Sequence, residues 1–445
     1  MKHILVLGAG MSSPCLIHHL LEEGARKGWT VTVADLDQRA AEKRVGGHAA
    51  GRALAFDVRD LPGRRRMIEQ ADVVVNLLTP LFQPELAAEC VETGTHFVSA
   101  SYSSPEVRAL DREARDKGLL VLTECGLDPG IDHMSAMQMI RRIQGEGGVI
   151  RSFWSYGSGV PAPETPANPL KYVITWNPRN VVLAGQKGAQ YLEKGRQKIV
   201  PGLRMFENTW PVDVPGVGGM EAYPNRDSLL YPELLGLKDL HTMVRATLRH
   251  KGFAAVWHQI VRLGLNSEHV SIPGLSGLTF AEVTRMFLPR SMDGCELEQG
   301  VANLLGISPT GVQMDTLRWL GLFSDELVGG SGESPADMMV GLLQRKLALE
   351  GQTRDMVILQ HEMDVEQDGR THTERATLVV KGDPGGFTAM SRTVGLPAAL
   401  SVCLLLDGKL EERGALLPIT AAIYDPVMAA LAEQGIVFQH DRLGA

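Results

Sequence analysis

The chain has 445 residues, of which 44% are hydrophobic and 22% are charged, and its formal net charge is −8 at pH 7. This length and composition are typical of an ordinary globular protein with two or three domains. The acidic balance argues against a nucleic-acid partner, because binding to a phosphate backbone favours a basic face.

The cysteines and the hydropathy of the chain indicate a compartment. The five cysteines are scattered and form no CxxC pair, which argues against a disulfide framework or a zinc knuckle and favours a reducing environment. The apolar run at the N-terminus is shorter than that of a signal peptide, and no stretch approaches the length of a membrane span. We therefore expect a cytoplasmic protein with no membrane partner.

The first 130 residues alternate between two patterns. Short apolar runs rich in β-branched residues are separated by helical patterns, as at 17–27 and 85–93. Continuous apolar runs bounded by turn residues are typical of buried parallel strands. This part is therefore predicted to be a doubly wound parallel sheet of the Rossmann type in an α/β fold. The predicted strands are residues 4–7, 31–34, 53–56, 73–78, 96–98 and 119–122.

The middle of the chain contains pieces of a second sheet. Residues 152–159 have a strand-like pattern, and the runs at 356–365 and 373–381 flank Asp368-Gly369, a strong hairpin signal. We interpret these pieces as one antiparallel sheet that an insertion interrupts.

The insertion spans residues 228–351 and contains few strand signals. Amphipathic patterns within it predict helices at 241–249 and 254–263. After the second sheet come two helical runs and a short apolar strand at 436–438. We expect this C-terminal piece to return to the first sheet and extend it.

These patterns divide the chain into three parts. The alternating strands and helices mark a dinucleotide-binding Rossmann domain, the antiparallel pieces mark an α+β domain for substrate binding and dimerisation, and the amphipathic patterns mark a helical insertion. The predicted boundaries are 1–130 plus 385–445 for the first, 131–227 plus 352–384 for the second, and 228–351 for the third.

A glycine loop follows the first predicted strand. Gly8 permits a tight turn, and Gly10 lets the backbone approach a pyrophosphate at the start of the next helix. Ser13 stands where the dinucleotide-binding fingerprint has its third glycine, so the motif is incomplete. Its position between a strand and a helix is the context that phosphate binding requires.

Acidic residues follow the second and third predicted strands. Asp35 can accept hydrogen bonds from ribose hydroxyls and repel a 2′-phosphate, which favours NAD over NADP as the cofactor. Arg39 lies nearby in the sequence and could instead accommodate a 2′-phosphate. Asp57 is either an adenine contact or an ordinary surface aspartate, and the sequence leaves both interpretations open.

Three polar segments rich in glycine and proline follow strand-like runs, at 99–102, 126–133 and 223–228. In an open α/β sheet, ligands bind beyond the carboxyl ends of the strands, so the first two segments should line the binding crevice. Turn chemistry alone would also explain Asp128-Pro129-Gly130. For His133, a structural role is the favoured interpretation.

Several of these segments resemble one enzyme family. GLDPGIDHM (126–134), SYGSGVPAPE (155–164), NPLKY (168–172), YPNRDS (223–228) and TVGLPAA (393–399) are similar to signature segments of saccharopine dehydrogenase of the L-glutamate-forming kind. The similarity covers essentially the whole chain, in the same order. It is strongest to the NAD-using domain of the animal bifunctional lysine-degrading enzyme.

The resemblance implies a set of cofactor contacts. Thr175 matches a contact that reaches across from the second domain. The remaining matches lie in the loops at the strand ends of the first domain. Together with the glycine loop and the strand ends, we expect the dinucleotide at Gly8, Gly10, Met11, Ser12, Asp35, Asp57, Leu78, Val98, Ser99, Ala100 and Leu127, besides Thr175.

The resemblance also implies the substrate contacts. Tyr102 and Asp128 are the candidates for proton handling, each with a modest contribution, and no metal is required. Arginine suits a substrate with three carboxylates, because its planar fork binds a carboxylate through two hydrogen bonds. The implied substrate contacts are Ser101, Tyr102, Asp128, Arg226, Thr247, Leu248 and Arg249. One departure is Gly157, which stands where the family frequently has a cysteine.

The implied reaction is the NAD-dependent oxidative cleavage of L-saccharopine to L-glutamate and 2-aminoadipate 6-semialdehyde, by a homodimer. Hydride leaves the aminoadipate C6 carbon, and water hydrolyses the resulting imine. Two alternatives stay open. One is a related NAD(P)-dependent dehydrogenase of another secondary amine, such as carboxynorspermidine. The other is a non-catalytic nucleotide sensor, against which the intact GLDPG and PNRDS segments argue.

Overall fold

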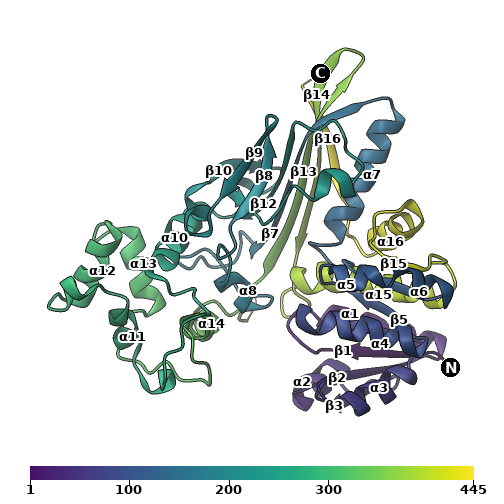
Figure 1. The fold of residues 1–445 in the computed structure, drawn as a ribbon, viewed down its shortest axis with the longest axis horizontal. Coiled ribbons are helices and arrows are strands. Elements are labelled where there is room, and N and C mark those ends of the chain that lie inside the picture. Colours follow the sequence, from purple (N-terminus) through teal and green to yellow (C-terminus); the bar gives the residue numbers. More distant parts are fainter. Residues whose placement is uncertain (352, 445) are drawn as a thin grey trace.

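The computed structural model describes residues 1–351 and 353–444. They form two β-sheets, and the chain passes from one sheet to the other several times (Figure 1). The first sheet has the strand order β15-β6-β5-β4-β1-β2-β3 within the described residues. All of its neighbouring strands pair in parallel. Its strands are β1 (His3–Leu7), β2 (Thr30–Asp35), β3 (Gly51–Ala55), β4 (Val73–Asn76), β5 (His96–Ser99), β6 (Leu120–Leu122) and β15 (Gly414–Leu416).

Helices cover both faces of this sheet, as the continuous apolar strands predict. In β1, Ile4 and Val6 pack on one face with α1 and α15, whereas Leu5 and Leu7 pack on the other face with α3 and α4. The predicted doubly wound α/β fold is therefore confirmed. The helices around this sheet are α1 (Pro14–Lys27), α2 (Gln38–Val45), α3 (Leu61–Glu69), α4 (Gln83–Thr93), α5 (Pro105–Ala109), α6 (Asp111–Asp116), α15 (Ala389–Leu406) and α16 (Ala421–Glu433).

The second sheet is mixed, and its main path is β10-β11-β12-β7-β13-β14-β16. The predicted hairpin is confirmed: β13 and β14 pair from Met356↔Lys381 to Gln367↔Arg370, with Asp368 at φ 52° and Gly369 at φ 72° in the turn. The strands are β7 (Val149–Pro161), β8 (Ala189–Glu193), β9 (Arg196–Val200), β10 (Trp210–Val214), β11 (Gly218–Pro224), β12 (Thr242–Arg249), β13 (Asp355–Gln367), β14 (Arg370–Lys381) and β16 (Gln439–Leu443).

A helical lobe packs around the buried Trp257 at one side of the second sheet (Figure 1, green). The helix predicted at 254–263 is confirmed as α10. This lobe contains α10 (Phe253–Leu263), α11 (Phe280–Met286), α12 (Leu297–Leu305), α13 (Val312–Leu320), α14 (Pro335–Lys346) and the 3-10 turns η3 (Leu275–Gly277) and η4 (Arg290–Met292). The remaining helical elements are the 15-residue α7 (Ile131–Gly145) and the short α8 (Pro178–Val182), α9 (Tyr231–Leu234), η1 (Pro80–Phe82) and η2 (Gly202–Glu207).

The helix predicted at 241–249 is wrong, because this segment is strand β12. It pairs with β7 in parallel and with β11 in antiparallel fashion, which places it inside the second sheet. Val244, Ala246 and Leu248 belong to one core and Met243 to another, so the side chains alternate between two buried faces. A half-buried strand is recognised in a sequence by its alternating polar and apolar residues. A strand that is buried on both faces lacks this alternation.

The C-terminal segment returns to the first sheet, but through β15 and not through residues 436–438. Gly414 pairs with Leu120 and Leu416 with Leu122. The last strand, β16, instead pairs with β14 at the edge of the second sheet. Its sequence QHDRL is polar, which suits an exposed edge strand. The three-part division of the chain stays a prediction.

Helix α15 shows why hydropathy alone is ambiguous. Its 18 residues have a mean hydropathy of 1.6, so by length and composition it meets the description of a membrane span, contrary to the sequence expectation. However, 78% of it is buried inside the protein, where it packs against α1 and the first sheet. It therefore serves as a core helix.

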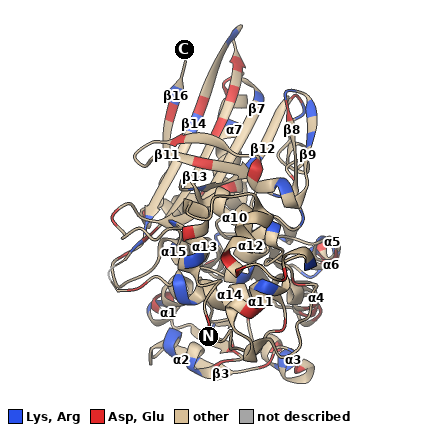
Figure 2. Ribbon diagram, turned by 90° about the vertical axis from the view of Figure 1, so that its left-hand side faces the viewer, with Lys and Arg blue, Asp and Glu red and all other residues tan. Residues whose placement is uncertain are grey.

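In the view of Figure 2, basic and acidic residues are interspersed along the described elements.

Candidate active site

The carboxyl ends of the first sheet face the second sheet across a cavity of about 790 Å³. Tyr102 follows β5 and Asp128 follows β6, and both line the cavity. Arg226, Thr247 and Arg249 line it from the second sheet. The structure therefore brings together five of the seven predicted substrate contacts from segments that lie far apart in the sequence, whereas Ser101 and Leu248 do not line the cavity.

The glycine loop after β1 has the predicted backbone geometry. Gly8 has φ 107°, and an added Cβ would lie 3.2 Å from the carbonyl carbon of Leu77. Both observations favour glycine at this position. An added Cβ at Gly10 would meet no described atom within 4 Å, so Gly10 leaves open space where a ligand can approach. The Ser13 hydroxyl donates to the Gly10 carbonyl (2.8 Å) and holds the loop against α1.

Asp35 binds the protein backbone. Its carboxylate accepts hydrogen bonds from the amides of Ala9 (2.7 Å) and Asp37 (2.9 Å). These bonds tie the end of β2 to the glycine loop. The side chain thus has a structural partner on each oxygen, which the sequence interpretation did not anticipate.

A group of cations lies beside the glycine loop. The guanidinium of Arg44 donates to the carbonyls of Ala9 (3.2 Å) and Gly10 (3.1 Å). Partial burial lowers its pKa, and the Asp35 carboxylate opposes that shift. Arg44, Lys43 and Thr175 line a second cavity of about 810 Å³ with Met11. Lys43 and Arg44, in the last turn of α2, are cations of the kind that accommodates the extra 2′-phosphate of NADP.

The other predicted cofactor positions fall into two groups. Leu127 lines the cavity that contains Tyr102 and Asp128, and Leu78 follows β4, where its amide donates to the Asn76 side chain (3.1 Å). Val98 and Ser99, by contrast, are buried within β5, and the Ser99 hydroxyl donates to Gln83 (2.6 Å). A dinucleotide could contact Val98 and Ser99 only through their backbone atoms.

Four further predicted positions lie in loops, three of them for the cofactor and one for the substrate. Asp57 pairs with Arg59 (2.7 Å), and hydrogen bonds from Arg59 lower the pKa of its carboxyl to about 2. Ser12 and Ala100 lie in the loops after β1 and β5. Ser101 lies in the same loop as Ala100, and its amide donates to the Ser99 hydroxyl (3.2 Å).

Tyr102 and Asp128 form a direct pair in the cavity wall. The Tyr102 hydroxyl donates to Asp128 Oδ1 (2.7 Å). Burial raises the pKa of Tyr102 well above its ordinary value, so it stays a neutral donor. Burial also raises the pKa of Asp128, but Arg245 and the Tyr102 hydrogen bond outweigh it and hold the pKa below its ordinary value. An added Cβ at Gly157 would lie 3.3 Å from Asp128 Oδ2.

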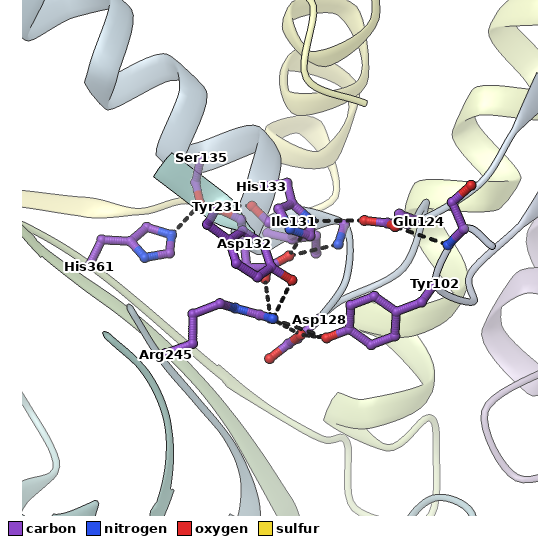
Figure 3. A network of polar contacts seen from close by, with 12 residues as sticks. Tyr102, Glu124, Asp128, Ile131, Asp132, His133, Ser135, Tyr231, Arg245 and His361 are labelled. Carbon is purple, nitrogen blue, oxygen red and sulfur yellow. Dashed lines mark hydrogen bonds and ion pairs between the residues drawn. The ribbon is translucent and has the colours of Figure 1, made fainter. Parts of the chain in front are cut away.

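Arg245 is a site residue that sequence reasoning missed. It lies on β12, is only 4% exposed, and contacts Asp128, Asp132 (3.0 Å) and the hydroxyl of Tyr102 (3.2 Å) (Figure 3). The signal was available: Arg245 is a lone charge in an apolar run, and buried arginines are paired. The incorrect helix prediction for this segment hid it.

Arg226 and Arg249 are cations aimed at the cavity. The guanidinium carbon of Arg226 lies 4.9 Å from the centre of the Tyr102 ring, and that of Arg249 lies 4.8 Å from Tyr172 and 5.4 Å from Phe253. Within the described residues, neither arginine forms an ion pair, and Arg249 Nε lacks a hydrogen-bond partner. Arg249 is buried, whereas Arg226 is exposed. A buried cation is stable only with an anionic or hydrogen-bonding partner, which an anionic ligand can provide at Arg249.

Two details refine the predicted substrate contacts. The carboxylate of Asp227 does not pair with Arg226 but accepts from Gln190 (2.7 Å) and from the amide of Leu229 (2.8 Å). Leu248 points into the core of the second sheet, and its carbonyl accepts from Ser158 (2.7 Å). Of the predicted stretch 247–249, only Thr247 and Arg249 line the cavity.

A parallel sheet with a glycine loop, facing a cavity with an ionisable pair and two arginines, defines a nucleotide-dependent oxidoreductase. Two family models match the chain: the saccharopine dehydrogenase NADP binding domain over residues 4–122 and the saccharopine dehydrogenase C-terminal domain over 126–436. The chain belongs to the saccharopine dehydrogenase family. The resemblance seen in the sequence motifs is therefore confirmed.

Individual relatives are similar over most of the chain. Saccharopine dehydrogenase [NADP(+), L-glutamate-forming] of Saccharomyces cerevisiae is 32% identical over 97% of both chains. Mitochondrial alpha-aminoadipic semialdehyde synthase of Mus musculus is 36% identical over 84% of this chain, which spans 41% of that longer protein. The apo structure of histidine-tagged saccharopine dehydrogenase (L-Glu forming) from S. cerevisiae superposes with a TM-score of 0.88 at 30% identity and covers both chains completely.

The comparisons correct the cofactor prediction. We expected NAD as the main cofactor because of Asp35. The matching family model is an NADP-binding domain, and the fungal relatives are named NADP(+) enzymes, so NADP and not NAD is indicated. The structure supplies a physical reason: the Asp35 carboxylate accepts from two backbone amides, and Arg44 lies beside it.

Proposed function

We propose that the chain catalyses the NADP-dependent oxidative cleavage of L-saccharopine. Saccharopine, NADP⁺ and water would give L-glutamate, 2-aminoadipate 6-semialdehyde, NADPH and a proton. The observation that carries this proposal is the convergence of Arg226 and Arg249 with the Tyr102–Asp128 pair on one cavity. A substrate with three carboxylates and a secondary amine is complementary to two cations and a proton acceptor.

The two arginines orient the substrate. Arg249 is 6% exposed, so the charge that it neutralises is largely removed from water. Arg226 lies at the more open side of the cavity, over the Tyr102 ring. Charge-assisted hydrogen bonds to two carboxylates would fix the position of the secondary amine along the cavity, beside Asp128.

Asp128 and Tyr102 manage protons. An ionised Asp128 can accept a proton from the water that adds to the imine carbon of the oxidised substrate, and the neutral Tyr102 hydroxyl orients it. When bound, the dinucleotide supplies the hydride acceptor, which the protein only needs to position. The cofactor positions at the strand ends, with Thr175 opposite, would hold it, and Lys43 and Arg44 would face its 2′-phosphate.

The proposal is tested by a steady-state assay of the purified full chain. With saccharopine and NADP⁺, we expect NADPH absorbance to rise together with equimolar L-glutamate. NAD⁺ in place of NADP⁺ should be the poorer substrate. Turnover of another secondary amine, such as carboxynorspermidine, without turnover of saccharopine would assign the site to that substrate class. Absence of oxidation with any secondary amine, despite dinucleotide binding, would contradict an enzymatic function.

A further inference from the structure

A buried charged cluster lies directly behind the Tyr102–Asp128 pair. Figure 3 shows Arg245 reaching from β12 to Asp128 on one side and Asp132 on the other. Its guanidinium donates to Asp132 Oδ2 (3.0 Å) and contacts the hydroxyl of Tyr231, whose ring centre is 4.4 Å away. One guanidinium therefore contacts two carboxylates and two tyrosines, which come from three different segments of the chain.

The two carboxylates differ in their access to the cavity. The Asp128 side chain is 24% exposed, whereas that of Asp132 is 3% exposed. Asp132 Oδ1 accepts from the amide of Gly130 (2.7 Å), so this carboxyl is fixed at the start of α7. Asp128 can reach a ligand, and Asp132 can act only through Arg245.

Further titratable groups face the cluster from the elements packed around it. His133 on α7 has Nδ1 3.2 Å from Asp132 Oδ1 and 3.8 Å from Glu124 Oε2, and its ring stacks on Tyr231. His361 on β13 contacts Ser135, one turn along α7 (2.9 Å). The other facing groups are Tyr102, Tyr231 and Arg226.

The charges of this cluster do not balance if every carboxyl is ionised. Asp128, Asp132 and Glu124 would carry three negative charges beside one guanidinium, in a region largely closed to water. Like charges in such a site cannot all ionise, and the least hydrated group keeps its proton. Burial and the Asp128 charge raise the pKa of Asp132 to about 7, whereas burial lowers that of His133 to about 4.

We propose that Arg245 is a positioning residue that holds Asp128 ionised and turned toward the cavity, while Asp132 behind it carries the proton that the pair of carboxylates retains. This inference rests on the proposed function, because it assigns Asp128 as the proton acceptor. The Arg245 fork fixes the orientation of Asp128 Oδ1 against Tyr102. The neutral Asp132 accepts a hydrogen bond from the guanidinium, and the positive charge of Arg245 is then neutralised by Asp128 alone.

The first test uses Arg245→Lys, which keeps the charge and loses the planar fork. We expect kcat/KM for saccharopine to fall by about tenfold or more, which is within the range for general acid–base catalysis. Because Asp128 loses hydrogen bonds that favour its ionised form, the acid limb of the pH profile should move to higher pH. The dissociation constant for NADPH should stay unchanged. Arg142→Lys, which alters an ion pair of α7 with Glu374 outside the cavity, is the matched control.

A purely structural Arg245 would lower the melting temperature or the amount of active enzyme and leave the acid limb in place. That outcome would overturn the proposal. The control variant should leave both kcat/KM and the pH profile unchanged.

A second test does not depend on catalysis. Infrared difference spectroscopy of the full chain detects the carbonyl stretch of a buried protonated carboxyl. We expect such a band to titrate near neutral pH in the unmutated protein and to be absent in Asp132→Asn. A band that persists in Asp132→Asn would overturn the assignment of the proton, whether or not the enzyme oxidises saccharopine. Failure of the saccharopine assay with the band intact would instead count against the proposed function alone.

Discussion

The two ends of the cleft are built in different ways. At the cofactor end, the glycine loop, Asp35 and Arg44 come from the first 45 residues and are joined by hydrogen bonds to the backbone. At the substrate end, Tyr102, Asp128 and Arg245 come from three distant segments and are joined through their charged or hydroxyl groups.

This difference indicates at which end of the cleft ligand binding depends on individual side chains. A site formed by backbone geometry is limited by the space and dihedral angles of its loop. In a site formed by buried charges, removing one charge leaves its partner unpaired. An unpaired buried charge is strongly destabilising. Substitutions at the substrate end should therefore have the larger effects.

The largest effect is expected for Arg226→Ala. Arg226 is exposed without a ligand, but a carboxylate bound in the cavity would desolvate it, and removing one partner of such a charge-assisted pair costs about 2–5 kcal/mol. At about 1.4 kcal/mol per decade, kcat/KM for saccharopine should fall by roughly 30-fold or more. Lysine should rescue only part of the loss, because a point charge cannot reproduce the fork. NADPH affinity, measured by fluorescence titration, should not change.

Arg204→Ala is a matched control for Arg226→Ala. Arg204 is an exposed arginine that pairs with Glu207 (2.9 Å) away from the cavity. Unchanged saccharopine kinetics in folded Arg226→Ala would remove Arg226 from the substrate site and leave Arg249 as the carboxylate ligand. Weaker NADPH binding in the same variant would show that the two ends of the cleft are coupled, which would break the comparison.

A smaller effect is expected for Tyr102→Phe. This change removes the hydrogen bond to Asp128 and leaves the ring under Arg226. A hydrogen bond to a charged group contributes about 1.5–3 kcal/mol, so kcat should fall by about tenfold or more. The KM for saccharopine should change less, because the carboxylate ligands remain. Tyr424→Phe, on α16, provides the control, and a KM effect larger than the kcat effect would contradict proton handling by Tyr102.

The cofactor end can be probed with two neighbouring glycines. Gly8→Ala introduces a side chain at φ 107° and within 3.2 Å of the Leu77 carbonyl carbon, so it should lower stability by about 1–3 kcal/mol. Gly10→Ala has space within the protein and should leave the melting temperature unchanged. It should nevertheless weaken NADPH binding, because the added methyl occupies the approach to the phosphates.

Thermal unfolding and NADPH titration separate the two outcomes. If Gly10→Ala bound NADPH with the affinity of the unmutated protein, the phosphates would not approach this part of the loop. If Gly8→Ala had an unchanged melting temperature, the loop would be more adaptable than its geometry indicates.

The smallest effect on stability is expected when the pH is lowered. Burial lowers the pKa of His361 to about 3 and that of His133 to about 4. Both histidines are neutral in the folded protein, so their contribution to stability is complete above pH 6.5 and is lost as the pH falls toward those values. Each should reduce the free energy of unfolding by about 1 kcal/mol between pH 6.5 and 5.5, because the unfolded histidine is already half protonated at pH 6.5.

Urea unfolding at several pH values checks this expectation. The decline should be shallower in His361→Gln than in the unmutated protein, whereas His269→Gln, an exposed control, should leave the slope unchanged. An equal slope in His361→Gln would show that acid destabilises the protein at other groups.

The sequence predicted the cofactor end better than the substrate end. The parallel strands, the glycine loop and the position of Asp35 follow from patterns within a few dozen residues. Which partners Asp35 has could not be predicted, because Arg44 lies on the following helix and the amides of the loop carry no sequence signal. That limit produced the incorrect preference for NAD.

At the proposed substrate end, the resemblance to the family named Tyr102, Asp128, Arg226 and Arg249 as candidates, but no pattern in the sequence placed them together. Arg245 was missed because β12 is buried on both faces and therefore lacks the polar alternation of a half-buried strand. Its role depends on pairing with β7, which begins almost a hundred residues earlier.

The pairing of β15 with β6 has a consequence for biosynthesis. A ribosome makes residues 120–122 before the second sheet, and residues 414–416 only after every strand of that sheet except β16. Until then the edge of β6 is open, and an open strand edge is a template for association with other chains. A nascent or truncated chain that ends at residue 384 should therefore aggregate or recruit chaperones, which sedimentation after in vitro translation would detect. The sheet that is translated first gains its last strand only after most of the second sheet has been made.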